Sequence, residues 1–322
     1  MSAIDPAALR ETVRDSGLFA RDRPVVAMLS GGRDSTCLLD VAVALLGAPA
    51  VCALHVNYGL RDGAGPEERR CRELCGALGV ELHVVAAGDP EPGNLQAWAR
   101  ELRYAEAERL AGERDALIAT GHTASDQVET ILYRLAASPG RRALLGMPLA
   151  EGRLIRPLLA LTREQTAAYC VSRGLPFSED PSNEDPRFAR TRVRAGLLPA
   201  LRAVHPAAEL NVLRTAALLR EETELLDGLV AAELEGRSGV EVARLREMPA
   251  ALARMLVVRL AEQAAGTYVP QAGERVAELL SLARRGGRAE LHVGGRAGAV
   301  IEDGMLRMVR LPPRDSAPPD GD

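Results

Sequence analysis

The stretch VVAMLSGGRDS, residues 25–35, joins a short apolar run to the start of a helix. Residues 25–29 contain β-branched and other apolar side chains only, which is typical of a strand buried on both faces of a parallel sheet. Apolar residues then recur at helical spacing from Leu38 to Leu46, and Gly47 with Pro49 ends that helix. The sequence therefore predicts a strand, a glycine loop and a helix in succession.

The loop between strand and helix has the chemistry of a phosphate-binding site. N–H groups at the start of a helix lack intrahelical partners and lie at the positive end of its dipole, so anions bind there. Gly31 and Gly32 permit positive φ, and Ser30 and Ser35 add hydroxyl donors. Asp34 repels phosphate unless a Mg²⁺ lies between them, so we expect Asp34 to bind Mg²⁺. Alternatively, the loop is only a tight turn with Asp34 as the helix N-cap.

This loop resembles the SGGxDS motif of the PP-loop ATP pyrophosphatases, enzymes that split ATP into AMP and pyrophosphate. The resemblance implies that ATP contacts the loop residues Ser30, Gly31, Gly32, Arg33, Asp34 and Ser35. A Walker A loop requires a lysine, and all 40 Lys and Arg residues of the chain are arginine. No predicted strand is followed by GxGxxG, which argues against a dinucleotide-binding site of the Rossmann type.

Length and composition predict a globular protein large enough for two domains. The chain has 322 residues and a net charge of −4, so it is not basic throughout. It has no apolar span near 20 residues and no signal-peptide segment, so we expect a cytoplasmic protein without a membrane partner. The five cysteines include no CxxC pair. Cys71 and Cys75 could bind metal or form a redox pair, but their spacing also fits an apolar helical stripe.

Further apolar runs predict the rest of a parallel sheet. Strands are expected over residues 50–56, 80–86 and 116–120, with helices between them. His55 and Asn57 lie at the carboxyl end of the second strand, where open α/β sheets bind ligands. We therefore predict that they lie on the adenine side of ATP, although Asn57 and Gly59 could simply form a turn.

The stretch from Gly121 to Thr130 is the second candidate region. Its apolar spacing predicts a helix with Asp126 and Glu129 one turn apart on the polar side. Two carboxylates beside an ATP site could hold an ammonium group or a metal ion. The same spacing also fits a capping box between Asp126 and Glu129, which would have no chemical role.

Two groups of arginines are candidates for contact with nucleic acid. Arg100, Arg103 and Tyr104 share one face of a helix, and Arg190 and Arg194 lie one turn apart. Solvated basic faces show the same pattern, so charge alone does not decide between the two interpretations.

Together the motifs resemble those of one family, the tRNA(Ile)-lysidine synthetases. The resemblance covers roughly residues 24–205 and rests on these motifs: Ser30–Ser35, His55–Arg61, Ala99–Tyr104, His122–Thr130, Leu145–Met147, Arg156–Leu159, Glu179–Asn183 and Arg190–Arg194. The family usually has Asp where Ser125 stands, His where Tyr58 stands and Asn where Thr191 stands. The first departure weakens the case for a metal site built from adjacent carboxylates.

We therefore predict an α/β fold of two domains. Residues 1–206 would form a parallel-sheet, Rossmann-like PP-loop nucleotide-binding domain. Residues 207–311 would form a smaller, mostly helical C-terminal domain that ends in short strands and clasps tRNA. Residues 312–322, rich in Pro and Asp, are expected to be disordered.

The resemblance implies a ligase that acts on the isoleucine tRNA with anticodon CAU. The wobble cytidine is adenylated at C2 by ATP, and free L-lysine then replaces AMP to form lysidine. Asp34, Asp126 and Glu129 would be catalytic, the last two holding lysine, and tRNA would contact His122, Arg100, Arg103, Tyr104, Arg190 and Arg194. The sequence leaves open whether Asp126 or Glu129 acts as a base. It also leaves the oligomeric state open, a homodimer included.

Three other functions fit parts of the pattern. A tRNA thiolase of the same superfamily needs a CxxC pair or a nucleophilic cysteine, whereas we expect Cys37 to face the core. A non-catalytic ATP-binding module would leave Asp126, Glu129 and Arg194 without a role. An amide-forming synthetase would need an ammonia source, and no glutaminase domain is recognisable.

Overall fold

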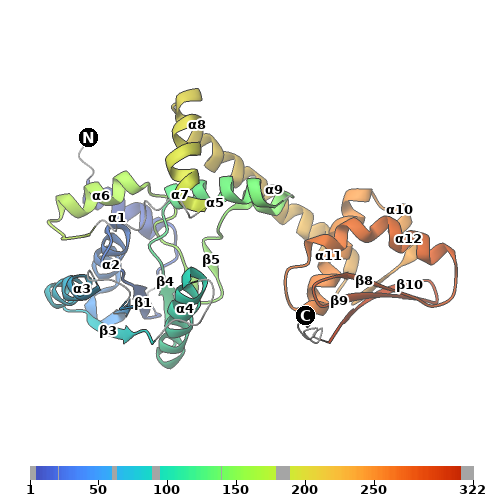
Figure 1. Cartoon of the computed structure of the whole chain (residues 1–322), viewed down its shortest axis with the longest axis horizontal. Helices are drawn as coiled ribbons and strands as arrows, with labels where there is room; N and C mark the ends of the chain where they lie inside the picture. The colour runs from blue at the N-terminus through green and yellow to red at the C-terminus, as the bar shows by residue number, and fades with distance from the viewer. Residues whose placement is uncertain are drawn as a thin grey trace, which may run out of the picture. The chain divides into compact units, whose positions relative to one another are not determined.

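The computed structural model describes residues 5–20, 22–59, 64–88, 95–138, 140–178 and 189–312, and it confirms the predicted α/β fold (Figure 1). Contacts divide the chain into two compact units, residues 1–219 and 220–322, and the division falls within α9 (Ala208–Leu234). The domain boundary after residue 206 and the disordered tail stay predictions. The tail from residue 313, Leu60 and Arg61, and the motif Glu179–Asn183 lie outside the described residues.

The first unit contains a six-stranded sheet in the order β3-β2-β1-β4-β6-β5. The strands are β1 (Val25–Met28), β2 (Val51–Asn57), β3 (Glu81–Ala86), β4 (Leu117–Ala119), β5 (Ala150–Glu151) and β6 (Leu154–Ile155). Strands β1 to β4 and β6 are parallel, and β5 pairs antiparallel with β6. The strand order reverses between β1 and β4, and ligands of open α/β sheets bind at such a switch point.

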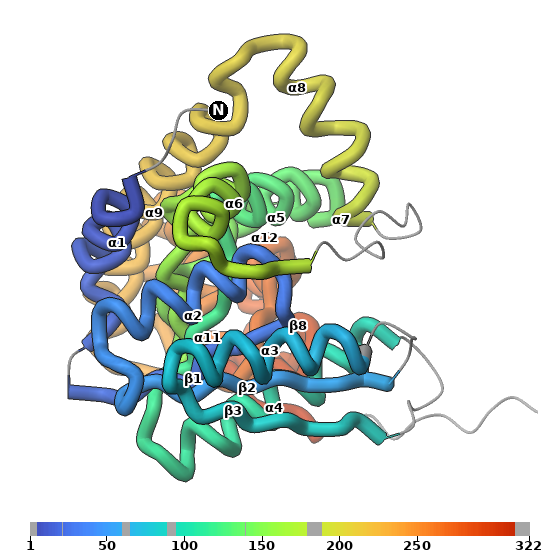
Figure 2. The backbone as a smooth tube through the Cα atoms, turned by 90° about the vertical axis from the view of Figure 1, so that its left-hand side faces the viewer, coloured from blue at the N-terminus to red at the C-terminus, as the bar shows by residue number. Residues whose placement is uncertain are grey.

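Helices cover both faces of this sheet, as Figure 2 shows for strands β1 to β3. On one face, α2 (Arg33–Leu46) and α3 (Ala64–Leu78) pack on Ala27 of β1. On the other face, α4 (Leu95–Arg114) packs on Val26 and Met28. Because side chains alternate between the two faces of a strand, a strand between two helical layers is apolar throughout, as β1 is.

The remaining helices of this unit surround the carboxyl end of the sheet or pack beside α2. They are α1 (Pro6–Asp15), α5 (Ala124–Ala137), α6 (Arg163–Ser172), α7 (Ala189–Arg192) and α8 (Leu198–Val204), with 3₁₀ turns at Ala48–Ala50 and Arg141–Leu145. A π-helical turn, Val193–Leu197, joins α7 to α8. Leu198 packs on Val128 and Leu132 of α5, which holds this arginine-bearing segment beside the helix with Asp126 and Glu129.

The second unit has its own antiparallel sheet in the order β7-β10-β9-β8. Its elements are β7 (Gly239–Glu241), α10 (Val242–Glu247), α11 (Ala250–Ala265), a 3₁₀ turn (Pro270–Arg275), α12 (Val276–Arg284), β8 (Ala289–Gly294), β9 (Ala297–Glu302) and β10 (Met305–Arg310). Leu256 and Leu260 of α11 pack in one core with Leu306 of β10. None of the described helices is both long and apolar enough to cross a bilayer.

Candidate active site

The glycine loop leads from the end of β1 into α2. Gly31 has a φ of +78°, in the left-handed region that glycine adopts readily. Gly32 is extended instead, with φ −78° and ψ 162°, and is the N-cap of α2. Of the two glycines, Gly31 therefore uses the positive φ that glycine permits, and Gly32 does not. Asp34 lies in the first turn of α2, so the N-cap alternative for Asp34 is wrong.

Hydrogen bonds within the loop fix its shape. Ser35 Oγ donates to Gly32 O at 2.9 Å, accepts from Ser30 N at 3.2 Å and lies 3.1 Å from Ser30 Oγ. Ser178 covers one side of the loop, with its N–H and its hydroxyl both donating to Gly31 O. The N–H groups of Asp34 and Ser35 lie in the first turn of α2, where no helical carbonyl can accept from them. This geometry suits an anion, and the individual ATP contacts stay a prediction.

Gly121, directly after β4, lies against the glycine loop. A Cβ atom at this position would come within 2.9 Å of the Asp34 carbonyl carbon and 3.0 Å of Ser35 N. Real Cβ atoms do not approach backbone so closely, so glycine sets the spacing between the loops that follow β1 and β4.

The substitution Gly121→Ala should destabilise the protein by about 1–3 kcal/mol, because the backbone of Asp34 and Ser35 would have to move. Chemical denaturation measures this free energy of unfolding. Gly112→Ala in α4 is the matched control, since nothing lies within 4 Å of a Cβ there and alanine favours a helix. Equal stability of Gly121→Ala and the wild-type protein would contradict the steric argument.

The Asp34 carboxylate faces α6, a helix that we do not predict from the sequence. The Thr166 hydroxyl donates to Asp34 Oδ1, and Arg163 Nε lies 3.9 Å from Oδ2. Burial raises the pKa of Asp34 in spite of the Thr166 bond and the neighbouring arginines, and the Asp126 carboxylate raises it further. Arg33 Nε also lies 3.5 Å from Oδ1, so two arginines flank this carboxylate. Burial disfavours its ionised form, and a bound Mg²⁺ would favour that form.

Asp126 and Glu129 share one cation, Arg163. Arg163 Nη2 lies 2.5 Å from Asp126 Oδ1, and Nη1 lies 2.8 Å from Glu129 Oε1. Arg194 adds two bonds to Glu129, from Nε to Oε1 at 2.7 Å and from Nη2 to Oε2 at 3.0 Å. The Glu129 side chain is 2% exposed, and charged hydrogen-bond partners such as these offset the cost of burying a carboxylate.

Thr123 and Asp126 form the capping box of α5. Asp126 Oδ2 accepts from Thr123 N at 2.9 Å and from its hydroxyl at 2.7 Å, and the Thr123 hydroxyl accepts from Asp126 N. The alternative in which Asp126 caps the helix with Glu129 is therefore wrong, because the helix begins before Asp126. Burial would raise the pKa of Asp126, but Arg163 and the Thr123 bonds outweigh it and hold the pKa below its usual value. Asp126 is thus both a cap and an ionised acceptor.

Arg163 and Thr166 are the site residues that sequence reasoning misses. They belong to α6, whose capping box between Thr162 and Gln165 is a recognisable sequence signal for a helix start. Ser125, where the family usually has Asp, accepts from Arg163 N at 3.2 Å and so anchors the start of α6.

His122 lies at the carboxyl end of β4, with Nδ1 2.8 Å from the Thr120 hydroxyl. Burial lowers the pKa of His122 to about 4, so the ring is neutral at neutral pH. The nearby cations Arg156, Arg103 and Arg190 lower the pKa of His122 further. The Asp126 carboxylate acts in the opposite direction, and the contact of His122 with tRNA stays a prediction.

Stability should fall as the pH drops from about 6.5 towards about 4, because the unfolded chain takes up a proton on His122 that the folded chain does not. The contribution of His122 to the free energy of unfolding is fully present above the unfolded pKa and amounts to about 3 kcal/mol. Denaturation at several pH values in this window measures it. His122→Asn should flatten the pH dependence, whereas His205→Asn, at an exposed position, should not. An identical slope in His122→Asn and wild type would contradict the assignment.

Arg100, Arg103 and Tyr104 form a cation–aromatic group on α4. The guanidinium carbons of Arg100 and Arg103 lie 4.7 Å and 5.8 Å from the centroid of the Tyr104 ring. Tyr58, where the family usually has His, donates to Ala99 O at 2.9 Å and so fixes the start of this helix. Arginines stacked on an aromatic ring suit a nucleotide, and contact with tRNA stays a prediction.

Arg190 and Arg194 differ in their surroundings. Arg194 is bonded to Glu129, whereas Arg190 is exposed on α7. Residues 193–197 are π-helical, so the one-turn spacing expected for an α-helix does not hold across this segment. Arg194 therefore belongs to the carboxylate cluster, and Arg190 is the better candidate for a phosphate contact.

His55 and Asn57 shape the loops at the ends of β1 and β2. His55 Nδ1 lies 2.9 Å from Leu29 O, and the Asn57 side chain accepts from Gly59 N at 3.0 Å and donates to Glu68 at 2.8 Å. These bonds give both side chains a structural role that needs no ligand. The adenine contact stays a prediction.

Cysteines offer no second reactive centre. All five are buried free thiols, and burial raises the pKa of Cys71 to about 11 and that of Cys75 to about 12. Both pack in the core between α3 and the sheet, which agrees with the apolar-stripe interpretation. Thiols with such pKa values are protonated and unreactive at neutral pH.

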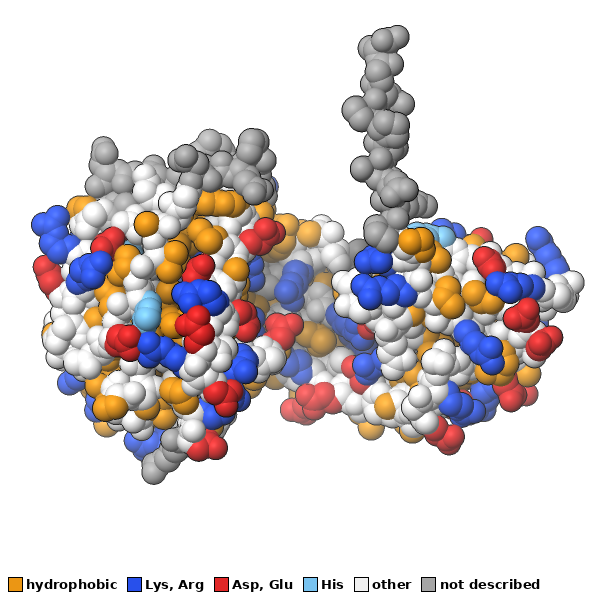
Figure 3. Space-filling view, turned by 90° about the horizontal axis from the view of Figure 1, so that it is seen from below, with side chains coloured by type: hydrophobic (Ala, Val, Ile, Leu, Met, Phe, Trp, Pro, Cys, Tyr) orange, Lys and Arg blue, Asp and Glu red, His pale blue; other side chains and the backbone are white. Residues whose placement is uncertain are grey.

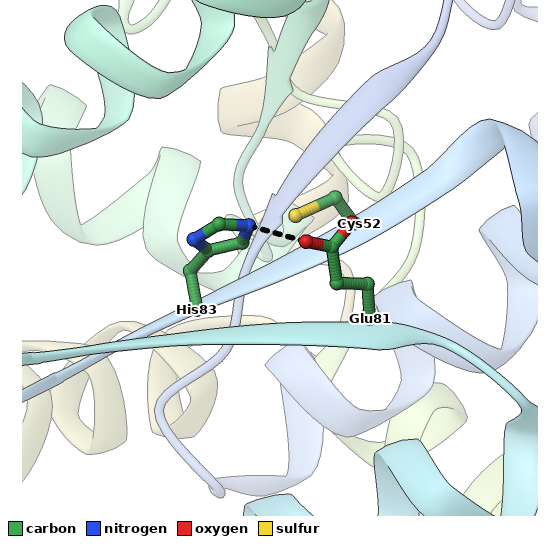
Figure 4. Close-up of side chains that lie close together, drawn as sticks. All are labelled: Cys52, Glu81 and His83. Atoms are coloured by element: carbon green, nitrogen blue, oxygen red, sulfur yellow. Dashed lines mark hydrogen bonds and ion pairs between the residues drawn. The ribbon is translucent and has the colours of Figure 1, made fainter.

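One cluster at the amino ends of the strands has the composition of a metal site (Figure 4). Ligand atoms of Cys52, Glu81 and His83 lie within 4.8 Å of one another. Arg114 donates to both Glu81 oxygens at 2.8 Å and 2.9 Å and lies 2.7 Å from His83 Nε2. Because this guanidinium already supplies the positive charge, we assign no metal to the cluster.

Known proteins share both the sequence and the fold of this chain. The family model described as a PP-loop domain matches residues 6–201. The tRNA(Ile)-lysidine synthase of Mycolicibacterium paratuberculosis is 36% identical over 314 residues, covering 94% of this chain and 96% of its own. That of Pseudomonas syringae pv. tomato is 40% identical over 213 residues, covering 64% and 47%. The chain thus spans about half the length of the Pseudomonas relatives that it matches.

Among solved structures, the U34-tRNA thiolase NcsA from Methanococcus maripaludis superposes with a TM-score of 0.56. It is 18% identical in sequence, and the match covers 66% of this chain and 78% of the thiolase, which shows a shared fold. Because the family model covers most of the first unit and one relative matches almost end to end, this chain belongs to the PP-loop proteins and, among them, to the tRNA(Ile)-lysidine synthase family.

Proposed function

We propose that this protein is an ATP-dependent ligase that converts the wobble cytidine of the isoleucine tRNA with anticodon CAU into lysidine. The observation that carries the proposal is the position of Arg163 between Asp34 on one side and Asp126 with Glu129 on the other. A loop suited to phosphates and a carboxylate pair suited to an amine therefore lie within reach of one side chain. A two-step reaction on one base needs such proximity.

In the first step, the C2 oxygen of cytosine attacks the α-phosphate of ATP, and the bond to pyrophosphate breaks. The N–H donors at the start of α2 would stabilise the negative charge on the phosphates. Asp34 would hold Mg²⁺, whose charge would offset that of the phosphates. The C2 oxygen then carries AMP, a far better leaving group than an unmodified carbonyl oxygen.

In the second step, the ε-amine of free lysine attacks C2, and the bond between C2 and the oxygen of AMP breaks. Asp126 and Glu129 would receive the ammonium group and orient it. Lysine must lose a proton before it attacks, and an ionised carboxylate beside the amine can accept that proton.

The proposed tRNA contacts lie around His122, Arg100, Arg103, Tyr104 and Arg190. On the face that Figure 3 shows, acidic and basic side chains are interspersed in each unit. Three arginines, Arg156, Arg103 and Arg190, act on His122 beside the Asp126 carboxylate, which supports this region as the place where the anticodon loop binds.

Arg190→Gln should weaken tRNA binding several-fold at low salt and reduce the slope of log K against log salt by about 1, because one phosphate contact is lost. Filter binding at several salt concentrations measures both quantities. Arg109→Gln is the matched control, since this arginine of α4 is paired with Glu106 and Glu113. A salt slope equal to that of the wild-type protein would contradict a phosphate contact.

The proposed activity is tested by incubating the protein with ATP, radiolabelled lysine and an unmodified transcript of the isoleucine tRNA. We expect one label per tRNA, located in the anticodon, and release of AMP and pyrophosphate. A transcript with uridine at the wobble position is the control and should take up no label. Consumption of ATP without labelled tRNA would favour one of the other PP-loop activities.

A further inference from the structure

We infer that Arg163 occupies, in the protein without substrates, the place of the substrate cation, so that lysine enters by displacing the Arg163 guanidinium from Asp126 and Glu129. The inference rests on the proposed function for the identity of the amine. It gives Arg163 a role in substrate binding in addition to neutralising the buried carboxylates.

The charge of the cluster gives the first argument. Asp126 and Glu129 carry two negative charges, and Arg163 and Arg194 carry two positive charges, all within direct ion-pair distance. The four side chains are therefore neutral together and offer no excess negative charge to an ammonium group. Tight binding of lysine requires that one guanidinium leave the carboxylates.

The bonding pattern indicates which guanidinium leaves. Arg194 holds both oxygens of Glu129 in a bidentate pair, whereas Arg163 gives one bond to each of two carboxylates. Departure of Arg163 therefore removes one donor from Asp126 Oδ1 and one from Glu129 Oε1 at the same time, while Oε1 keeps its bond from Arg194 Nε. An ammonium group has three N–H donors and can bridge these two oxygens as Arg163 does.

Arg163 can move without disturbing its helix. Its backbone is held independently of the side chain, since its N–H donates to Ser125 Oγ at 3.2 Å. A third carboxylate is also within range, because Asp34 Oδ2 lies 3.9 Å from Nε. Rotation about the side-chain torsions can therefore carry the guanidinium towards Asp34 while α6 stays in place.

The exchange has a consequence for affinity. Lysine has to overcome the pairing of Arg163 with the carboxylates, so its apparent affinity is lower than that of the same carboxylates without Arg163. While no lysine is present, Arg163 pairs with the buried Glu129 carboxylate and offsets its loss of hydration.

Calorimetry of lysine binding to the full chain, with an unreactive ATP analogue present, tests the inference. Arg163→Gln should bind lysine about tenfold more tightly than the wild-type protein. Arg163→Lys is the matched control and should bind lysine about as weakly as wild type, because its own ammonium can occupy the same place. Millimolar guanidinium should compete with lysine in Arg163→Gln, and sodium chloride at equal ionic strength should not.

The steady-state KM for lysine gives an independent measurement in the complete reaction. It should fall in Arg163→Gln by a similar factor, while the KM for ATP changes little. Equal or weaker lysine binding and an unchanged or higher KM in Arg163→Gln would overturn the inference. A crystal structure of the wild-type protein with lysine in which Arg163 keeps both bonds would also overturn it, even if the variant did not fold.

These outcomes are distinguishable from failure of the proposed function. If the wild-type protein labels tRNA with lysine but Arg163→Gln binds lysine no better, the displacement of Arg163 is wrong and the activity stands. If the wild-type protein forms no lysidine, the proposed function is wrong.

Discussion

Asp34→Asn is expected to lower the rate of tRNA adenylation by about a thousandfold while the protein stays folded. The amide keeps the shape of the carboxylate, and its oxygen can still accept the hydrogen bond from the Thr166 hydroxyl. It has no negative charge, so it is a poor ligand for Mg²⁺. Release of pyrophosphate in the presence of tRNA measures the rate, and circular dichroism checks the fold.

The matched control for this substitution is Asp115→Asn. The Asp115 side chain is 80% exposed, and its φ of +46° is a conformation that asparagine tolerates. It lies outside the glycine loop, between α4 and β4. Adenylation by Asp115→Asn should equal that of the wild-type protein. A rate for Asp34→Asn within tenfold of wild type would remove Asp34 from the proposed metal site.

The central strands of the first unit could be predicted from sequence because local pattern alone determines them. Strand β1 is apolar at every position, and the glycines that follow it mark the loop directly. Strands β5 and β6 have only two residues each, which is too short for a period to be recognised. In the second unit β7 and α10, with three and six residues, are too short to be predicted for the same reason.

The electrostatics of the site could not be predicted in this way. Asp126 and Glu129 stand out because they are two carboxylates on one helix, but their partner Arg163 lies on a different helix. Thr166 bonds to Asp34 across a separation of 132 residues, and no spacing rule connects them. The family resemblance implies a tRNA contact for Arg194, and no pattern indicates its bond to Glu129, which it makes from the π-helical turn. Local pattern therefore identifies the acids, and tertiary packing decides which cations they hold.

Glu129→Gln is expected to separate the two steps of the proposed reaction. Glu129 accepts three bonds from Arg163 and Arg194 and is almost fully buried, so the substitution leaves two guanidiniums with Asp126 as the remaining negative charge. An ammonium group is then repelled, and the KM for lysine should rise by about a hundredfold or more, since unbalancing a buried ion pair costs about 3–5 kcal/mol. Adenylation needs no lysine and should stay within a few-fold of wild type.

Measurement of both steps on one preparation makes the outcome decisive, because a folding defect would lower adenylation and lysine transfer together. Glu113→Gln is the matched control, since this residue of α4 is 57% exposed and pairs with Arg109. It should leave both steps unchanged, as surface ion pairs contribute little. Parallel loss of both steps in Glu129→Gln would indicate that Glu129 serves packing alone. An unchanged KM for lysine would mean that the amine binds elsewhere, and Arg163 and Arg194 would then be counter-ions to a structural carboxylate.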